Sequence, residues 1–159
     1  MNTTKNDLPE TTRTKVAELL NARLADALDL QSQMKQAHWN VKGKHFIALH
    51  ELFDKINEDV EEYVDTIAER AVQLGATAFG TVRIAAKNSG LAEYPLEITA
   101  GHDHVAAVST ALAIFGKATR AGIDKSDELK DKGTADLFTE ISRGVDKWLW
   151  MVEAHLQDK

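Results

Sequence analysis

Five side chains of the types that bind metal ions lie between residues 38 and 69, at intervals typical of helices. They are His38, His50, Asp54, Asp65 and Glu69. Residues i and i+4 project from one face of a helix, so the last four form two pairs. The chain has 0 Cys, which leaves only nitrogen and oxygen ligands for a metal site. Two histidines with three carboxylates suit iron, in its ferrous and its ferric state, as well as manganese or zinc.

The two pairs are too far apart on one helix to share an ion. Asp54 and Asp65 are separated by 11 residues, so both pairs face the same side of the helix. The rise over that stretch is about 16.5 Å, whereas metal–ligand bonds are about 2.0–2.2 Å. Either the pairs serve different metals, or an antiparallel copy of the helix from a second subunit completes each site twice by symmetry. We infer an intersubunit site, which His38 reaches from the preceding helix.

A structural alternative exists for each carboxylate taken singly. Acidic helix faces are common, and the same helix carries further solvated acidic residues, namely Glu58, Glu61 and Glu62. That alternative does not account for the full set of ligands. His38 and His50 interrupt apolar or neutral helical stretches, and buried histidines need polar partners.

The chain has few residues that break helices. Its 159 residues suffice for one domain with a buried core, and they include only 2 Pro and 9 Gly. Apolar residues at 3-4-3-4 spacing over residues 45–74 predict one long helix that carries both ligand pairs. Similar patterns, with Thr11 or Thr12 as the first cap, predict helices at residues 11–39, 81–87, 99–123 and 134–156.

The order of these elements predicts the fold class. Two helical hairpins joined by one long crossover form a ferritin-like four-helix bundle, and the crossover here spans residues 75–99 and contains the short helix. We therefore expect an all-α fold in a single domain over residues 11–159. We also expect a short flexible tail over residues 1–10 and an exposed, charged loop over residues 124–133.

Charge and hydropathy exclude other classes of protein. The polar N-terminus shows no signal peptide, and no run of about 18 apolar residues could span a membrane, so we expect a cytoplasmic protein. The net charge of −6 argues against broad electrostatic binding of nucleic acid. The tail has one basic residue, Lys5, against Asp7 and Glu10. These features predict weak or absent DNA binding.

The ligand-bearing stretch resembles a known family. The run H-W-N-V-K-G-K-H-F from residue 38, its continuation to Asp54, and D-T-I-A-E-R at residues 65–70 resemble the ferroxidase signature of the Dps family, the DNA-binding proteins from starved cells, or mini-ferritins. The likeness continues through A-V-Q-L-G-A-T-A-F-G at 71–80, Y-P-L-E-I at 94–98, T-A-D-L-F at 134–138 and S-R-G-V-D-K-W-L-W at 142–150. It therefore covers nearly the whole chain.

The resemblance implies a function and an assembly. Dps subunits are four-helix bundles that assemble as a dodecamer, a hollow cage of tetrahedral symmetry. They oxidise Fe(II) with hydrogen peroxide, or with dioxygen, at two-iron sites on two-fold interfaces, and they store a ferric mineral that protects the cell and its DNA. Here His38, His50 and Asp54 match the ligands of one subunit, and Asp65 and Glu69 match those of its neighbour. Zinc can compete for the same ligands.

The resemblance also suggests accessory residues. Trp39 is expected beside the site, where it quenches radicals or is simply a core aromatic. Glu61 and Glu62 are candidates for mineral nucleation. Asp136 and Glu140, with Asp131 nearby, are candidates for an acidic three-fold pore, and the alternative for each is an ordinary acidic start of a helix.

The remaining histidines are expected mostly on the surface. His45 lies about 140° around the helix from His50, so it is a surface residue or an accessory metal residue. His102 and His104 point apart at i and i+2 and are expected to be exposed, like His155 near the C-terminus.

Two other functions compete with the iron-oxidising cage. One is a DNA-binding protein of the nucleoid in which the metal site is vestigial or minor. The other is a helical interaction module, which gives no reason for paired ligands on one helix. The complete ligand set favours the cage over both.

Overall fold

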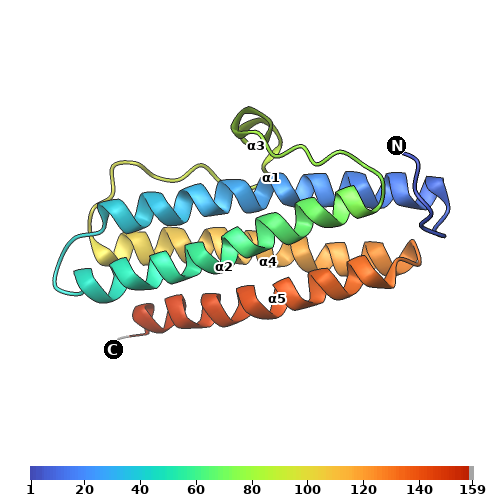
Figure 1. The fold of residues 1–159 in the computed structure, drawn as a ribbon. Coiled ribbons are helices and arrows are strands. Elements are labelled where there is room, and N and C mark those ends of the chain that lie inside the picture. The colour runs from blue at the N-terminus through green and yellow to red at the C-terminus, as the bar shows by residue number, and fades with distance from the viewer. Residues whose placement is uncertain (158–159) are drawn as a thin grey trace.

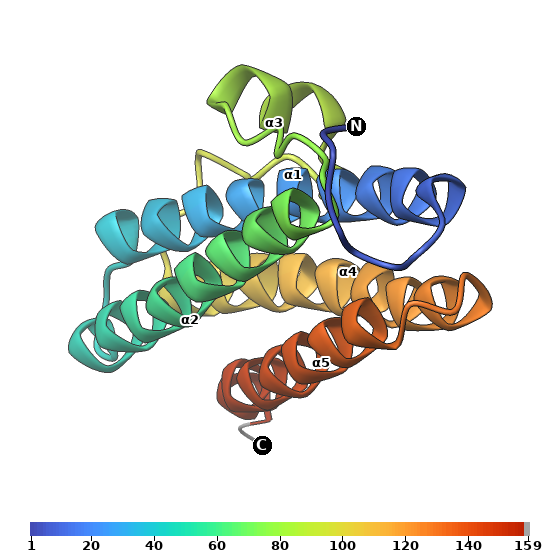
Figure 2. The same ribbon diagram turned by 45° about the vertical axis from the view of Figure 1, so that its right-hand side comes forward.

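The computed structural model describes residues 1–157, and within them it consists of helices without a β-strand. Figure 1 shows four long helices running side by side, with a short helix lying outside the bundle above α1. The view in Figure 2 shows the same arrangement from another side. The elements are α1 (Glu10–Asn40), α2 (Phe46–Gln73), α3 (Val82–Asn88), α4 (Gly101–Glu128), α5 (Lys132–Glu153) and the 3-10 helix η1 (Ala154–Leu156). The prediction of an all-α, ferritin-like bundle is confirmed.

The long helix α2 is built on the expected apolar spacing. Its core-facing side chains are fully or almost fully buried, at 0–3% exposure, and they are Leu49, Phe53, Ile56, Val60 and Ile67. Burial of one such side chain contributes about 1.5–3 kcal/mol, so this face holds α2 firmly against the bundle. The opposite face of α2 is left for polar groups.

The crossover between α2 and α4 is tied to α1 by polar side chains. Buried Asp26 accepts a hydrogen bond from the backbone N of Gly90 at 2.7 Å, and Gln33 donates to the backbone O of Ala92 at 3.0 Å. At the far end the backbone N of Lys42 donates to the O of Thr99 at 3.0 Å. The crossover therefore returns the chain to the α1–α2 turn, where α4 begins.

Glycine at position 75 allows the N-terminal segment to pack against the end of α2. Gly75 has φ 84°, in the left-handed region, and its carbonyl accepts a 2.6 Å hydrogen bond from the backbone N of Asn2. A Cβ at this position would lie 2.8 Å from the backbone O of Asn2, so a larger residue is excluded. Buried Arg13 donates to the backbone O of Leu74 at 2.9 Å and fixes the same junction.

Several expected boundaries are wrong. The charged loop over residues 124–133 is mostly helical, since α4 continues to Glu128 and only residues 129–131 separate it from α5. The stretch over residues 124–133 is not exposed throughout, because Ser126 and Asp131 are 0% and 2% exposed. Asp131 caps α5 by accepting from the backbone N of Thr134 at 3.1 Å, and Lys130 supplies the left-handed residue, with φ 65°.

Smaller corrections concern the ends of α1 and α5. Helix α1 begins at Glu10, directly after Pro9, without a side-chain cap from Thr11 or Thr12. Helix α5 ends at Glu153 rather than near Leu156. Two of its side chains expected in the core, Leu137 and Leu149, are only half-buried. No helix in the described part of the chain is long and apolar enough to cross a membrane.

Candidate metal centre

His38 and His50 form a compact pair between α1 and α2. Nδ1 of His38 lies 2.8 Å from the backbone O of His50, and Nδ1 of His50 lies 2.8 Å from the backbone O of His38. The two rings stack with centroids 3.7 Å apart and an angle of 21°. The hairpin that joins α1 to α2 brings these residues together although they are 12 positions apart.

This pairing leaves one nitrogen of each ring for a ligand. A carbonyl oxygen can only accept, so in both rings Nδ1 carries the proton and donates. The neutral imidazole then has its free lone pair on Nε2, which is the atom that binds a metal ion. A backbone acceptor on the other ring nitrogen is the usual way in which proteins orient a metal-binding histidine. The two hydrogen bonds therefore fix the orientation of both rings and leave both Nε2 atoms outside the pairing.

Asp54 lies beside the pair and is already engaged by a lysine. Its Oδ1 is 2.6 Å from Nζ of Lys35 and 3.9 Å from Nδ1 of His38. The hydrogen bond from Lys35 is the main cause that lowers the pKa of Asp54, so this carboxyl is ionised at neutral pH. Lys35 precedes His38 by three residues on α1, a spacing that points both side chains to one face. It was not among the sequence candidates.

Asp65 and Glu69 lie at the other end of the same face. Both are exposed on the uninterrupted helix α2, so a rise of about 16.5 Å separates Asp65 from Asp54, and Glu69 lies one turn farther away. Among residues 1–157 no group of three or more histidine and acidic side chains could hold a metal ion within one chain. The fold pairs His38 with His50 and places Oδ1 of Asp54 3.9 Å from Nδ1 of His38, whereas Asp65 and Glu69 lie apart from all three.

Two neighbouring surface grooves lie along α1 and α2 near these residues. One, of about 540 Å³, is lined by Asp65 together with Glu61 and Glu62, and Leu28 and Gln31 form part of its wall. A second groove, of about 880 Å³, also includes Leu28 and Gln31 and extends along α1 to Lys35 and Trp39. The two grooves share Leu28 and Gln31 and are therefore neighbours, with Asp65 lining one and Lys35, the partner of Asp54, lining the other.

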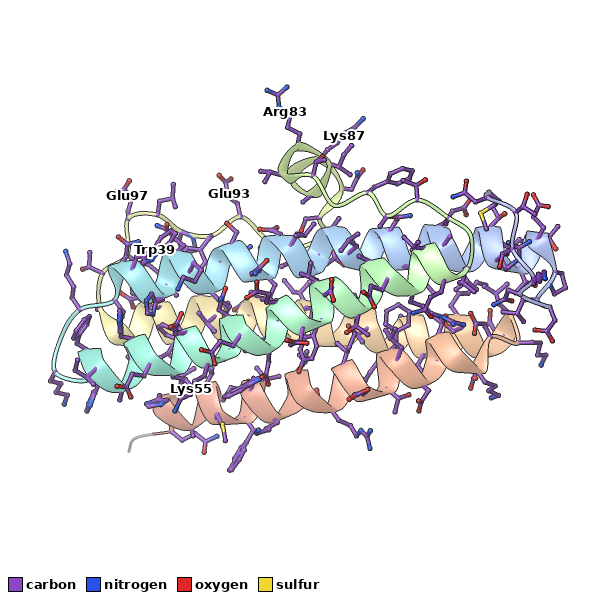
Figure 3. The ribbon with its side chains drawn as sticks, viewed as in Figure 1. Trp39, Lys55, Arg83, Lys87, Glu93 and Glu97 are labelled. Atoms are coloured by element: carbon purple, nitrogen blue, oxygen red, sulfur yellow. The ribbon has the colours of Figure 1, made fainter. Side chains whose placement is uncertain are left out.

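Trp39 is not a core aromatic of this chain. Its side chain is 67% exposed, and Nζ of Lys35 lies 5.9 Å from its ring centroid. Figure 3 shows Trp39 at the end of α1, under the crossover that bears Glu93 and Glu97. A large aromatic side chain this exposed, next to His38, is available to solvent or to another subunit.

The acidic residues near the start of α5 divide into two kinds. Asp131 is buried and caps α5, and its Oδ1 forms an ion pair with Arg70 at 2.8 Å. It is therefore a structural residue. Asp136 and Glu140 are exposed. The carboxylate of Glu140, with that of Asp59, lies close enough to Tyr63 to help raise its pKa to about 12, although burial is the largest cause.

One histidine was placed wrongly from the sequence. His45, His102 and His155 are exposed as expected, but His104 is 1% exposed. Its Nδ1 lies 2.7 Å from the hydroxyl of Tyr94. The i and i+2 spacing places His102 and His104 on different faces of α4, but that spacing alone does not say which face packs against the bundle.

Burial of His104 predicts a loss of stability in acid. Desolvation lowers the pKa of His104 below its usual 6.5, although Asp103 and the backbone of Asn40 and Ile98 oppose the shift. The unfolded chain therefore binds a proton more readily, and stability falls as pH drops below about 6.5. We expect Tm to fall less between about pH 7 and pH 5 in His104→Gln than in the native protein. His102→Gln, two residues away and exposed, is the control and should keep the native slope.

Comparisons with known proteins agree with this geometry. A family model described as a ferritin-like domain matches residues 17–159. This match and a four-helix bundle with one long crossover between α2 and α4 define the chain as a ferritin-like protein. The chain belongs, more narrowly, to the Dps family.

Individual relatives cover nearly the whole chain. The DNA protection during starvation protein of Agrobacterium fabrum is 46% identical over 156 residues, which are 98% of this chain and 96% of the relative. The structure of Mycobacterium smegmatis Dps is 32% identical with a TM-score of 0.94, covering 99% of this chain and 96% of that one. A Vibrio cholerae Dps structure, described as a member of the ferritin-like diiron-carboxylate superfamily, is 27% identical with a TM-score of 0.91, covering 99% and 98%.

Proposed function

We propose that this protein stores iron and protects the cell by oxidising Fe(II) at ferroxidase sites shared between two subunits. One observation carries the proposal: two histidines with free Nε2 atoms stand beside Asp54, while the remaining ligand pair lies about 16.5 Å away on the same helix. Membership of the Dps family, and the diiron-carboxylate description of the Vibrio cholerae relative, support the choice of iron.

The exposed apolar face supports pairing with a second copy. Trp39, Val82 and Leu96 are 67%, 84% and 66% exposed, and all three line the groove along α1. Apolar patches of this kind mark protein contacts. A two-fold pairing over this face would cover them and would bring Asp65 and Glu69 of each chain to the histidines of the other. We propose that six such dimers form a dodecameric cage.

The residues support an ordered reaction. Fe(II) binds first to Nε2 of His38 and His50 with the carboxylates of Asp65 and Glu69 of the neighbouring subunit. A second, weaker position uses Asp54, from which the ammonium of Lys35 must withdraw. Hydrogen peroxide takes one electron from each Fe(II) and, with two protons, becomes two water molecules. Dioxygen is the alternative oxidant.

The products then leave the site. Fe(III) moves inward to carboxylates, for which the exposed Glu61 and Glu62 are our candidates because they share a groove with Asp65. Asp136 and Glu140 remain candidates for the entry path of Fe(II). Zinc, which suits the same nitrogen and oxygen ligands, should compete with Fe(II) for the site.

The central test measures oxidation and assembly on one sample. We expect peroxide-driven oxidation of Fe(II) by the purified protein, followed by absorbance of the ferric product, together with a native mass near twelve times the 17.6 kDa of one chain. Zinc added beforehand should slow the reaction. A dodecamer that oxidises Fe(II) no faster than buffer would leave the cage in place and refute the ferroxidase.

Removal of the lysine at Asp54 should strengthen the second position. Lys35→Met keeps the apolar stem and removes the ammonium, so the Asp54 carboxylate is freed for a cation. We expect the weaker of two Zn²⁺ binding events, measured by calorimetry, to tighten about two- to fivefold, the equivalent of a partly exposed ion pair. Lys55→Met is the matched control, since exposed Lys55 makes no ion pair within the described residues. Equal Zn²⁺ affinity of the weaker position in both variants would show that Lys35 does not compete with a cation for Asp54.

Binding of DNA is a second candidate function with little support from charge. The protein has a net charge of −6, and the first ten residues contain only Lys5 as a basic side chain. Because the phosphate term of DNA binding falls steeply with salt, we expect no shift of linear DNA in a gel at about 150 mM salt. Tight binding under that condition would overturn the expectation and favour a role in the nucleoid.

A further inference from the structure

Tyr94 and His104 form a buried hydrogen-bonded pair that the reaction above does not use. Tyr94 comes from the crossover and is 7% exposed, and His104 comes from the first turn of α4 and is 1% exposed. The phenol oxygen lies 2.7 Å from Nδ1 of His104, and the two rings are tilted by only 25°. A hydroxyl and a base at this distance are within reach for proton transfer.

The surroundings decide which group donates. Nε2 of His104 is buried without a hydrogen-bond partner in the described residues, while the backbone of Asn40 and Ile98 lies next to the ring and favours a protonated imidazole. That environment suits an N–H at Nε2, which leaves Nδ1 as the acceptor. The hydroxyl of Tyr94 therefore donates to Nδ1 of His104. Burial raises the pKa of Tyr94 and lowers the pKa of His104, so both partners are neutral at rest.

Tyr94 also borders the region of the metal centre. It lines the same groove of about 880 Å³ as Trp39 and Lys35. Trp39 directly follows the ligand His38 in the chain, and Asn40, the next residue, lies against His104. The last turn of α1 thus touches the metal centre on one side and the Tyr94–His104 pair on the other.

We propose that Tyr94 and His104 form a proton-coupled, one-electron oxidation site that stores one oxidising equivalent as a tyrosyl radical. In this step the phenol of Tyr94 loses an electron to a strong one-electron oxidant and its proton to Nδ1 of His104. The result is a neutral tyrosyl radical beside an imidazolium. Oxidation of a phenol without a proton acceptor would leave a far less stable radical cation, so the histidine makes Tyr94 the favoured endpoint.

The source of the oxidant rests on the proposed ferroxidase function. The ammonium of Lys35 is paired with the carboxylate of Asp54, so the second iron position can be empty when peroxide binds. The site then holds only one Fe(II). One Fe(II) reduces peroxide to hydroxide and a hydroxyl radical, and that radical, taking the electron of Tyr94 through Trp39, becomes a second hydroxide. When the next Fe(II) arrives, it returns an electron to the tyrosyl radical, and His104 returns the proton. Two Fe(II) are then consumed for each peroxide, and no radical escapes.

The chain offers a matched control for this proposal. It contains only 2 Tyr, and the second, Tyr63, packs between α2 and α5, close to Gly144. The charges near Tyr63 are the carboxylates of Asp59 and Glu140, and no histidine accepts its proton among the hydrogen bonds of the described residues. A tyrosyl radical in this protein must therefore belong to one of two positions with different surroundings.

The first experiment needs no iron. The assembled protein is oxidised by flash-generated ruthenium(III) tris-bipyridine, and the radicals are recorded by electron paramagnetic resonance at low temperature. We expect a neutral tyrosyl signal in the native protein and in Tyr63→Phe, and its loss in Tyr94→Phe. His104→Gln should retain Tyr94 yet shorten the life of the radical at least about tenfold, because the proton acceptor is gone.

The second experiment adds peroxide to protein that carries less Fe(II) than subunits, with freeze-quenching and parallel absorbance of ferric product. The same tyrosyl signal should appear and should be discharged by further Fe(II). Iron oxidation without a tyrosyl signal, or a signal that persists in Tyr94→Phe, would overturn the proposal. A signal in the flash experiment with no iron oxidation would instead uphold the pair and refute the ferroxidase. If Tyr94→Phe does not assemble, His104→Gln decides, and an unchanged radical lifetime there is contradictory.

Discussion

Replacement of both His38 and His50 by alanine should slow peroxide-driven oxidation of Fe(II) by at least on the order of 100-fold, the upper range for loss of groups that only orient a metal ligand. The reason is that both free Nε2 atoms of the site disappear together. Alanine keeps α1 and α2 helical, whereas glycine would weaken them by about 1 kcal/mol at each position. The measurement is the initial rate of ferric absorbance under saturating peroxide.

The double variant also loses the reciprocal hydrogen bonds between α1 and α2, so assembly needs its own control. Native mass separates a lost site from a lost cage, and we expect the dodecamer to persist because the core of the hairpin is apolar. His102→Ala serves as the matched histidine variant, since its side chain is 75% exposed and lies outside the site. A double variant with the native mass and the native rate would exclude His38 and His50 as ligands.

The sequence was sufficient to predict the bundle because its information is local and repeated. The apolar positions of α2 recur at helical spacing from Leu49 to Ile67, and all of them are buried except Tyr63, which is half-buried. The scarcity of glycine and proline left few places for the helices to end. The crossover was predictable for a similar reason, since its length between two helical hairpins permits few other paths.

Features that depend on contacts between distant residues could not be predicted in this way. The prediction of an exposed loop at residues 124–133 was wrong because it rested on charge alone, whereas Asp131 is buried by its contacts with Arg70 and Thr134. The prediction that His104 is exposed was also wrong, and its partner Tyr94 lies in the irregular crossover. The helical spacing from His104 to buried Val108 and Leu112 is the sequence signal that would have placed this histidine on the inner face of α4.

The sequence yields the candidate ligands, which stay a prediction, but not the detail of their surroundings. Spacing and ligand chemistry led to the five residues, and the fold pairs His38 with His50 and places Oδ1 of Asp54 3.9 Å from Nδ1 of His38. The tautomers of the two histidines and the ion pair of Lys35 with Asp54 emerged only from the structure. A lysine three residues before a candidate ligand on the same helix is the one signal that would have pointed to Lys35.

Two inactive variants should restore activity when they are assembled together. One carries alanine at His38 and His50, and the other carries Asp65→Asn and Glu69→Gln. In a mixed two-fold pair, one site combines both sets of substitutions and is lost, while the other combines the intact histidines of one chain with the intact carboxylates of its partner. Random pairing should therefore recover about one quarter of the native sites, from a mixture of parents that each have none.

The recovery distinguishes a shared site from a site within one chain, which neither double variant alone can do. Both variants must be dissociated, mixed and reassembled, and the rate is compared with that of the two parents mixed without dissociation. If each chain held its own complete site, every subunit in the mixture would still lack ligands, and no amount of exchange would restore oxidation. Recovery near one quarter, on the other hand, requires that His38 and His50 act with the carboxylates of a different subunit, because the rise of α2 keeps the two half-sites of one chain about 16.5 Å apart.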